Sequence, residues 1–342
     1  MKNIYNAAVI GCGRIGAEFD NDPRRKVIWT HAGAYKNSEK TELVSLSDVD
    51  GNRLEKAAEK FNVDKAYTDY SEMLKKEDLD IISICAWNSI HYKILKEAVL
   101  HNVKGIYCEK PIANNLEETD EMIRLCEENN VKLLVNHWRR FDGFHPKIKE
   151  FIDQGNLGMI QQASFYYTAG IANSGSHMFD LMRYFFGDVE FVQAHYKNNK
   201  EDPNIDGIVK FKSGLISTVQ SLEDEYYKKF SSFIYGAKGA IEITKSGFDL
   251  EMYEVRQSDK WSEYKELYRI QNPAIKYIEE SFMINGVKHL VDCIEKNKNP
   301  ISSGKDARES LALICAFHES AINDGKKIGL PLKTSNIHIK SK

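Results

Sequence analysis

The sequence lacks the features of a membrane, secreted or nucleic-acid-binding protein. No stretch approaches the roughly 18 consecutive apolar residues that a membrane-spanning helix needs. The amino terminus has neither the apolar segment nor the small-residue cleavage site of a signal peptide. The formal net charge is -3, so no basic field attracts nucleic acid. We therefore predict a cytoplasmic protein that binds neither membranes nor nucleic acid.

Cysteine is scarce, and its spacing excludes a further class of site. The chain has 6 cysteines, none of them in a C-x-x-C pair, and several lie inside apolar segments. Zinc sites usually draw on closely spaced pairs of ligands, so we predict no metal site. The cysteines are typical of small buried residues in a reducing compartment, which agrees with a cytoplasmic protein.

The chain is long enough for two domains. With 342 residues it is longer than a chain that forms one ordinary hydrophobic core. Its composition, with 42% hydrophobic and 28% charged residues, is ordinary for a globular protein. Over residues 1–135, short apolar strands alternate with helical patterns, which predicts an α/β, doubly wound parallel sheet covered on both faces. The predicted strands are Tyr5–Ile10, Glu42–Leu46, Ile81–Ala86, Gly105–Cys108 and Lys132–Val135, and the helices His31–Lys36, Asn52–Phe61, Tyr92–Leu100 and Leu116–Asn129.

The pattern changes over residues 136–342. Ile160–Tyr167 alternates like a half-buried strand, and several strand-like segments follow up to Tyr253. Breaks between them are predicted at Gly207, Ser213-Gly214, Gly236 and Gly239. Short turns favour antiparallel strands over further βαβ units, so we predict a second, α+β domain with a mostly antiparallel sheet. Its predicted helices are Pro146–Asp153, Ser176–Phe185, Glu280–Lys296 and Lys305–Asn323.

The first predicted strand leads into a glycine-rich turn. Gly11, Gly13 and Gly16 have the spacing G-x-G-x-x-G, after a strand and before a predicted helix. Such glycines turn the chain, admit a pyrophosphate and let helix and strand pack closely, while the helix N-terminus offers N–H groups to the phosphates. In this context the pattern predicts a nicotinamide dinucleotide site that includes Arg14 and Ile15. The alternative is a glycine turn without a ligand.

An acidic residue at the end of the second strand of such a fold binds the adenosine ribose hydroxyls. Asp48 occupies that position and would repel a 2′-phosphate, which favours NAD over NADP. It lies farther from the glycines than the roughly 20 residues expected, because of an insertion at Glu18–Trp29. The insertion carries Arg24-Arg25-Lys26, and this basic triplet leaves NADP open. The alternative role of Asp48 is that of a turn or helix-capping residue.

A charged motif, Glu109-Lys110-Pro111, closes the fourth predicted strand. In a doubly wound sheet the carboxyl ends of the strands face the ligand crevice. A lysine there is placed to touch a substrate hydroxyl beside the nicotinamide, and Pro111 would fix the turn that aims it. From position alone, a surface lysine in a strand-to-loop turn fits Lys110 equally well.

Motifs along nearly the whole chain resemble those of one family. They are Ile10–Gly16, Asp80–Cys85 with Asn88 and His91, Glu109–Pro111, Asn136–Phe141, Gly155–Gly158, Gly175–Asp180, Tyr235–Gly239 and Ser303–Leu311. The family is the Gfo/Idh/MocA group of glucose-fructose oxidoreductases and inositol dehydrogenases. The resemblance implies a Rossmann domain followed by a substrate-binding and oligomerisation domain with an open-faced, mostly antiparallel sheet. It also implies hydride exchange between a nicotinamide and a ring carbon of a sugar, cyclitol or sugar derivative, in a homodimer or homotetramer.

The resemblance also assigns roles to individual residues. It places the catalytic lysine at Lys110, the catalytic histidine at His177, and cofactor contacts at Asn88, His91 and Glu109.

Two positions depart from the family pattern. Asn173 stands where many members have an aspartate four residues before the histidine. Asparagine can hydrogen-bond a substrate, but it cannot carry charge or accept a proton as a base. Trp87 replaces the usual proline before Asn88, and its indole would either line the nicotinamide pocket or pack at the strand end.

Oxidising a secondary alcohol needs an acceptor for the hydroxyl proton and a partner for the developing alkoxide. We expect His177 to be the general base, since the unperturbed imidazole pKa of about 6.5 lets it cycle near neutral pH. Lys110 then stabilises the substrate oxygen and relays a proton, while Asn173 orients the substrate or the imidazole. The roles of Lys110 and His177 can be exchanged. Without the motif, His177 would be interpreted as a packed residue at a helix N-terminus.

His137, Arg139 and Arg140 follow the fifth strand, near the expected crevice. One interpretation is that they bind a carboxylate or phosphate on the substrate, which arginine binds in a bidentate manner. The other is that they form structural ion pairs within the protein. Two other functions stay open. One is an NAD-assisted glycoside hydrolase that uses the cofactor transiently, and the other is a dinucleotide-binding regulator without turnover, which Asn173 leaves open.

Overall fold

The computed structural model describes residues 4–340, which divide into two compact units. The first comprises residues 4–142 together with Glu279–Arg308, and the second comprises Gly143–Ile278 together with residues 309–340. The predicted domain division after residue 135 stays a prediction, because compactness does not show which segments fold independently.

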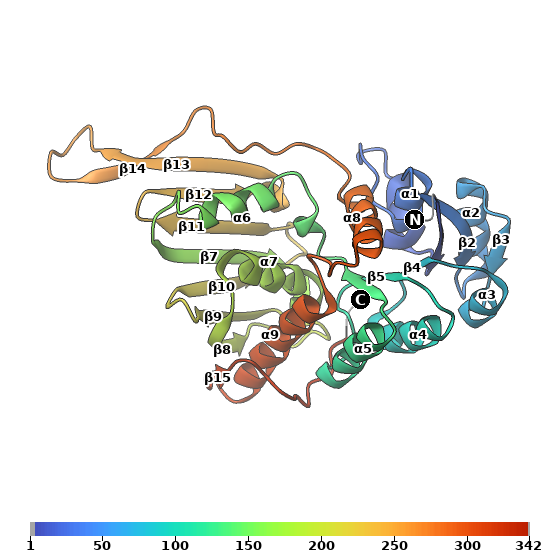
Figure 1. Ribbon diagram of the computed structural model, residues 1–342. Coiled ribbons are helices and arrows are strands. Elements are labelled where there is room, and N and C mark those ends of the chain that lie inside the picture. The colour runs from blue at the N-terminus through green and yellow to red at the C-terminus, as the bar shows by residue number, and fades with distance from the viewer. Residues whose placement is uncertain (1–3, 341–342) are drawn as a thin grey trace. The chain divides into compact units, whose positions relative to one another are not determined.

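The first unit is built on a parallel sheet, as predicted, and this sheet has six strands (Figure 1). Its strands are β1 (Tyr5–Ile10), β2 (Thr41–Ser47), β3 (Lys65–Tyr67), β4 (Ile81–Ile84), β5 (Gly105–Cys108) and β6 (Lys132–Val135). The helices are α1 (His31–Lys36), α2 (Gly51–Phe61), α3 (Tyr70–Lys76), α4 (Asn88–Leu100) and α5 (Leu116–Glu128). The strand order β3-β2-β1-β4-β5-β6 is that of a Rossmann fold, so the predicted fold class is confirmed.

The sequence patterns miss two elements at the edge of this sheet, β3 and α3. Strand β3 has 3 residues, and none of them is buried. Helix α3 buries Met73 and Leu74 within its 7 residues. Elements this short carry too few apolar positions to show a period in the sequence.

Helix α8 (Phe282–Lys296) belongs to the first unit although it follows the second in sequence. Ser281 caps it, since its hydroxyl accepts the Ile284 N–H. Val287 and Leu290 are buried at 0% exposure, and their spacing puts them on one helical face. They join the core formed by β1, β2, β5 and α1, so α8 covers one face of the parallel sheet.

The second unit is built on a nine-stranded sheet in the order β14-β13-β12-β11-β7-β10-β9-β8-β15 (Figure 1). Its strands are β7 (Ile160–Thr168), β8 (Val189–Tyr196), β9 (Ile205–Phe211), β10 (Ile216–Leu222), β11 (Phe230–Gly236), β12 (Gly239–Thr244), β13 (Asp249–Gln257), β14 (Lys265–Arg269) and β15 (Ile328–Gly329). Its helices are α6 (His145–Asp153), α7 (Ser176–Phe186) and α9 (Gly304–Ile322), of which the residues up to Arg308 belong to the first unit. Neighbouring strands are antiparallel except β7 and β10, so the mostly antiparallel sheet is confirmed.

Strand β7 shows how the two faces of this sheet differ. Ala163, Phe165 and Tyr167 point to one face and are buried at 0% exposure. Ser164 and Tyr166 point to the other face and are half-buried. One face is therefore packed and the other is more open, as the family resemblance implies.

One predicted break and one predicted end are wrong. Gly207 lies inside β9 rather than in a turn. A Cβ at this position would lie 2.5 Å from the Gln193 carbonyl oxygen and 2.9 Å from the Phe317 ring, so glycine is needed for close packing. The strands also continue beyond Tyr253, through the rest of β13 and into the outer strand β14, whose polar residues hide its strand character.

Candidate functional site

The glycine turn after β1 has the shape that a pyrophosphate site needs. Gly11 has φ +97°, and a Cβ on it would lie 2.7 Å from the Cys85 carbonyl. A Cβ on Gly16 would lie 1.9 Å from the Gly11 carbonyl oxygen, so a side chain there would force the turn apart. At Gly13, by contrast, no described atom beyond the chain neighbours lies within 4 Å of a Cβ. The open space beside Gly13 is a cradle in which backbone N–H groups can meet a phosphate, so the turn fits a dinucleotide.

The helix predicted after this turn is short. Arg14–Glu18 forms one π-helical turn (η1), and Phe19–Asn21 forms a 3₁₀ turn (η2). The inserted segment then folds back on Asp20, whose carboxylate accepts the Trp29 N–H and the Thr30 hydroxyl. A helix of 5 residues has little macrodipole, so the N–H groups of the turn itself remain to contact phosphates.

The basic triplet of the insertion makes local contacts. The Arg25 guanidinium lies 3.8 Å from the Phe19 ring centroid and 4.7 Å from that of Trp29. The Lys26 amine donates to the Pro23 carbonyl at 3.2 Å. These contacts give Arg25 and Lys26 a structural role that does not require a 2′-phosphate.

Asp48 follows β2 and joins it to the glycine turn. Its Oδ2 accepts the Cys12 N–H at 2.7 Å, and its Oδ1 accepts the Asp50 N–H at 2.9 Å. The Arg53 guanidinium lies 3.2 Å from Oδ1. Helix α2 is capped by Asp50 and not by Asp48, whereas the bond from the Asp50 N–H gives Asp48 the turn role that the sequence left open. The carboxylate is 4% exposed and stands at the strand end where the fold presents an adenosine ribose, which leaves the proposed NAD selection intact.

We expect Asp48→Ser to weaken NAD binding about tenfold more than NADP binding. The substitution removes the acceptor for the ribose hydroxyls and releases the Arg53 guanidinium to attract a 2′-phosphate. Dissociation constants for both cofactors, measured by calorimetry, give the ratio. Asp50→Ser is the matched control, because serine also caps a helix. An unchanged ratio in Asp48→Ser would show that Asp48 does not read the ribose.

Glu109 and Lys110 lie at the carboxyl end of β5. The Glu109 Oε1 accepts hydrogen bonds from His31 Nε2 at 3.0 Å and from Asn136 Nδ2 at 2.6 Å. Burial alone would raise the pKa of Glu109, but these bonds and the charges of His31 and Lys110 hold it below its usual value. Glu109 is therefore a buried carboxylate, and Lys110 beside it is half-buried. His31 is a site residue that the sequence patterns did not single out, because it opens a weakly patterned helix.

His91 and Asn88 lie on α4, and both are buried. The His91 ring nitrogens lie 2.9 Å from the Ala86 carbonyl oxygen and 3.1 Å from that of Ile112. Burial lowers the pKa of His91, and the carbonyl oxygens at its two ring nitrogens, from the loops after β4 and β5, oppose that shift. The cofactor contacts of His91 and Asn88 stay predictions. Trp87 is 62% exposed, so of its two interpretations the packing role is wrong.

The basic residues after β6 are enclosed. Arg140 is 5% exposed, and its guanidinium lies 3.2 Å from the Asp306 carboxylate. The structural ion pair that the sequence left open is therefore present at Arg140. The Arg139 guanidinium lies 4.2 Å from the Trp138 ring centroid, and His137 is 2% exposed. Contacts of His137, Arg139 and Arg140 with substrate stay predictions.

Asn173 and His177 lie in one short stretch of the second unit. Gly170–Gly175 forms a π-helical turn (η4), and α7 begins directly after it, so His177 is the second residue of that helix. The Ser176 hydroxyl donates to the Asn173 carbonyl at 2.8 Å and joins the turn to the helix. The placement of His177 therefore depends on how this turn is held.

Four successive N–H groups of the turn are bound by the segment 202–204. The Gly170 N–H donates to the Asn204 Oδ1 at 3.2 Å, and the Ile171 N–H donates to the Pro203 carbonyl at 3.0 Å. The N–H groups of Ala172 and Asn173 donate to the two carboxylate oxygens of Asp202, at 2.8 and 2.9 Å. No local pattern shows these contacts, because turn and segment are about thirty residues apart in the sequence.

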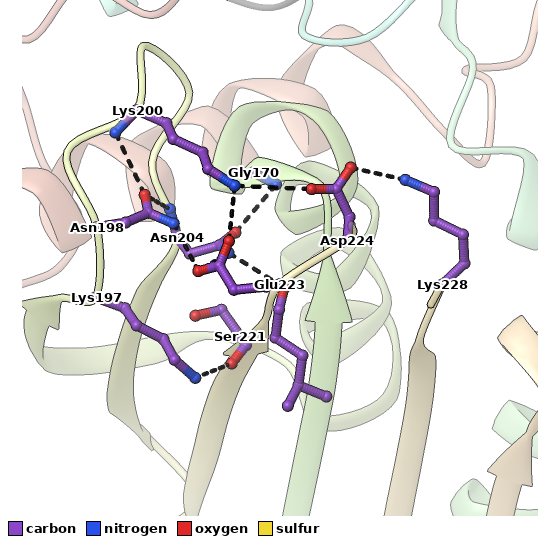
Figure 2. A network of polar contacts seen from close by, with 10 residues as sticks. Gly170, Lys197, Asn198, Lys200, Asn204, Ser221, Glu223, Asp224 and Lys228 are labelled. Carbon is purple, nitrogen blue, oxygen red and sulfur yellow. Dashed lines mark hydrogen bonds and ion pairs between the residues drawn. The ribbon is translucent and has the colours of Figure 1, made fainter. Parts of the chain in front are cut away.

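Figure 2 shows how this segment is anchored in turn. The Asn204 amide donates to the Glu223 Oε1 at 3.3 Å, and Lys200 pairs with Glu223 at 2.7 Å. The hydrogen bonds from Lys200 and Asn198 lower the pKa of Glu223, so it is charged at neutral pH. The carboxylate follows β10, and the network thus ties the turn before His177 to the central part of the sheet.

We expect Asp202→Ala to lower turnover about tenfold or more, because two N–H groups of the turn lose their acceptor and each unsatisfied group costs about 1–3 kcal/mol. Asp202→Asn keeps one acceptor oxygen and should lose less. Asp224→Ala is the control, since Asp224 bonds Lys228 in the same network (Figure 2). Turnover and melting temperature are measured for all three. Equal turnover in the two alanine variants would show that Asp202 does not set the turn.

Comparisons with known proteins agree with this architecture. Residues 5–137 match the model of an oxidoreductase family with an NAD-binding Rossmann fold, and residues 170–330 match the model of its C-terminal alpha/beta domain. The chain belongs to the Gfo/Idh/MocA oxidoreductase family. The resemblance drawn from the motifs is thus confirmed, and this Gfo/Idh/MocA protein is an NAD-dependent oxidoreductase.

Relatives of this Gfo/Idh/MocA protein cover nearly its whole length. It is 26% identical to a myo-inositol 2-dehydrogenase of Thermotoga maritima, over 91% of this chain and 95% of the relative. It is 26% identical to a scyllo-inositol 2-dehydrogenase (NAD(+)) of Bacillus subtilis, over 97% and 98%. A levoglucosan dehydrogenase solved with NADH and L-sorbose has a TM-score of 0.78 at 17% identity, over 97% of this chain and 100% of that one. This last likeness shows the fold alone.

Across residues 4–340, no helix is long and apolar enough to cross a membrane. In the same part of the chain, no group of three or more histidine, cysteine or acidic side chains could hold a metal ion.

Proposed function

We propose that this protein transfers a hydride between NAD and a ring carbon of a sugar, cyclitol or sugar derivative. The observation that carries the proposal is the pair Glu109 and Lys110 at the carboxyl end of β5, the edge where a Rossmann sheet presents its ligands. The names of the relatives support the substrate class, since they act on inositols or were crystallised with a sugar. NAD, when bound, accepts the hydride or returns it.

The chain supplies the acid–base and electrostatic groups of this reaction. In oxidation His177 takes the hydroxyl proton, and the Lys110 ammonium stabilises the negative charge that develops on the substrate oxygen. Asn173, at the turn before α7, donates a hydrogen bond that orients the substrate. In reduction the same groups act with the protons reversed. His137 and Arg139 are proposed to contact polar substituents of the substrate.

The cofactor contacts proposed for this chain come from three strand ends. The N–H groups of Gly13, Arg14 and Ile15 meet the pyrophosphate in the open cradle of the turn after β1. Asp48 after β2 accepts the adenosine ribose hydroxyls, and Glu109 after β5 accepts a hydroxyl on the nicotinamide side.

We also propose that the protein is a cytoplasmic homodimer or homotetramer. The more open face of the second-unit sheet carries aromatic side chains, with the Tyr166 and Phe233 rings 5.7 Å apart in an edge-to-face contact. Burying such a face in a second subunit removes apolar surface from water. Light scattering coupled to gel filtration measures the mass, and a monomer would contradict this proposal.

A substrate panel tests the reaction. The purified protein is incubated with NAD and cyclitols, free sugars, sugar acids and nucleotide-linked sugars, and NADH and products are followed by absorbance and mass spectrometry. We expect one keto product for each NADH formed. Cleavage of a glycosidic bond without added NAD would instead show a hydrolase. Tight NAD binding without turnover on the panel would indicate a regulator.

A further inference from the structure

A chain of buried hydrogen bonds runs beneath Glu109. His31, at 0% exposure, places Nε2 3.0 Å from the Glu109 Oε1 and Nδ1 2.7 Å from the Ser83 hydroxyl. The Tyr35 hydroxyl lies 2.8 Å from the same Ser83 oxygen. His31 is thus fixed at both ring nitrogens, between β4 and the end of β5, and it meets the Tyr107 ring edge-on at 4.5 Å.

The other side of the carboxylate is fixed by the direction of two hydrogen bonds. Burial raises the pKa of Tyr107, so its hydroxyl stays a donor, and it donates to the Asn136 Oδ1 at 3.0 Å. The amide NH₂ of Asn136 must then face Glu109, and it donates to the Oε1 at 2.6 Å. Oε1 therefore receives two donors, from His31 and from Asn136, and is held from within the protein.

The second oxygen of Glu109 is held far less tightly. Oε2 receives the adjacent Lys110 N–H at 3.3 Å, a long contact, and the side chain is 10% exposed. A carboxylate oxygen has two lone pairs, so Oε2 keeps capacity for a hydroxyl donor of a ligand. Anchoring Oε1 inward fixes the direction in which Oε2 is presented.

We propose that His31 is a positioning residue that orients the Glu109 carboxylate, so that its Oε2 receives a hydroxyl of NAD beside Lys110. This inference rests on the proposed cofactor contact of Glu109. Histidine suits the task because its rigid ring donates at Nε2 while Nδ1 is held by Ser83. A flexible side chain would leave the carboxylate free to turn.

A mutant cycle tests this assignment through NAD affinity, measured by calorimetry without any sugar present. His31→Phe keeps the ring volume and removes the donor, and we expect it to weaken NAD binding about tenfold. Glu109→Gln should weaken it comparably, and the double variant should be no worse than Glu109→Gln, since both act on one contact. His31→Gln, which restores a donor, should recover part of the loss.

Tyr35→Phe is the matched control. It removes a bond to the same Ser83 hydroxyl without touching Glu109, so NAD affinity should stay unchanged even if the melting temperature falls. NAD affinity within twofold of the wild type in folded His31→Phe, or an additive double variant, would overturn the proposal. Because no sugar is present, a protein that binds NAD but oxidises no sugar would refute the proposed reaction and leave this test intact.

Discussion

Replacing Lys110 by alanine is expected to lower turnover by a factor of about 10² or more, because the developing alkoxide loses its positive partner. Lys110 directly follows the buried carboxylate of Glu109 at the end of β5 and is itself half-buried. Loss confined to the transition state should appear in turnover with little change in NAD affinity.

The controls for Lys110 separate its charge from its position. Lys110→Arg keeps the charge but changes the donor geometry, so it should retain more activity than alanine without reaching the wild type. Lys96→Ala removes an exposed charge from α4 and should leave turnover unchanged. Wild-type turnover of Lys110→Ala on a confirmed substrate would remove the lysine from the mechanism.

His177→Ala is expected to cost a factor on the order of 10² to 10⁴ in turnover, the range for a general acid–base group. The reason is that no other group would then take the hydroxyl proton in the proposed reaction. His177 is the second residue of α7 and follows a turn whose N–H groups are bound by residues 202–204, so alanine, a good helix former, should leave turn and helix folded.

Two measurements distinguish catalysis by His177 from a packing role. His177→Asn keeps hydrogen bonding but not proton transfer, and it should be as slow as alanine. His338→Ala, an exposed histidine near the carboxyl terminus, should be fully active. If His177→Asn restores most of the turnover, the side chain orients the substrate and another group is the base.

Much of the first unit could be predicted from local sequence. Continuous apolar segments such as Gly105–Cys108 mark buried parallel strands, because both faces of such a strand are covered. The glycine spacing fixed the turn, since a Cβ on Gly16 would meet the Gly11 carbonyl oxygen. The break predicted at Gly207 is wrong, because the sequence does not distinguish a glycine needed for close packing inside a strand from a glycine needed in a turn.

Local patterns could not predict how the segment after the glycine turn folds or which contacts the basic triplet makes. After the short helix, Asp20 binds Trp29 and Thr30 across the insertion. Arg25 uses its charge on aromatic rings of the same segment. These contacts of Asp20 and Arg25 form only when separate parts of the insertion come together in the fold.

By itself the sequence determined the family, the Rossmann fold and the identity of Lys110 and His177 as candidates, because spacing along strands and turns is a local property. Only the tertiary structure decided which side chains fix Glu109, beside Lys110, and the turn before His177. His31 reaches Glu109 across 78 positions, and Asp202 reaches the turn before His177 across 29 and 30. Buried polar groups must find partners wherever the fold brings them, and one sequence does not encode those partners in any local period.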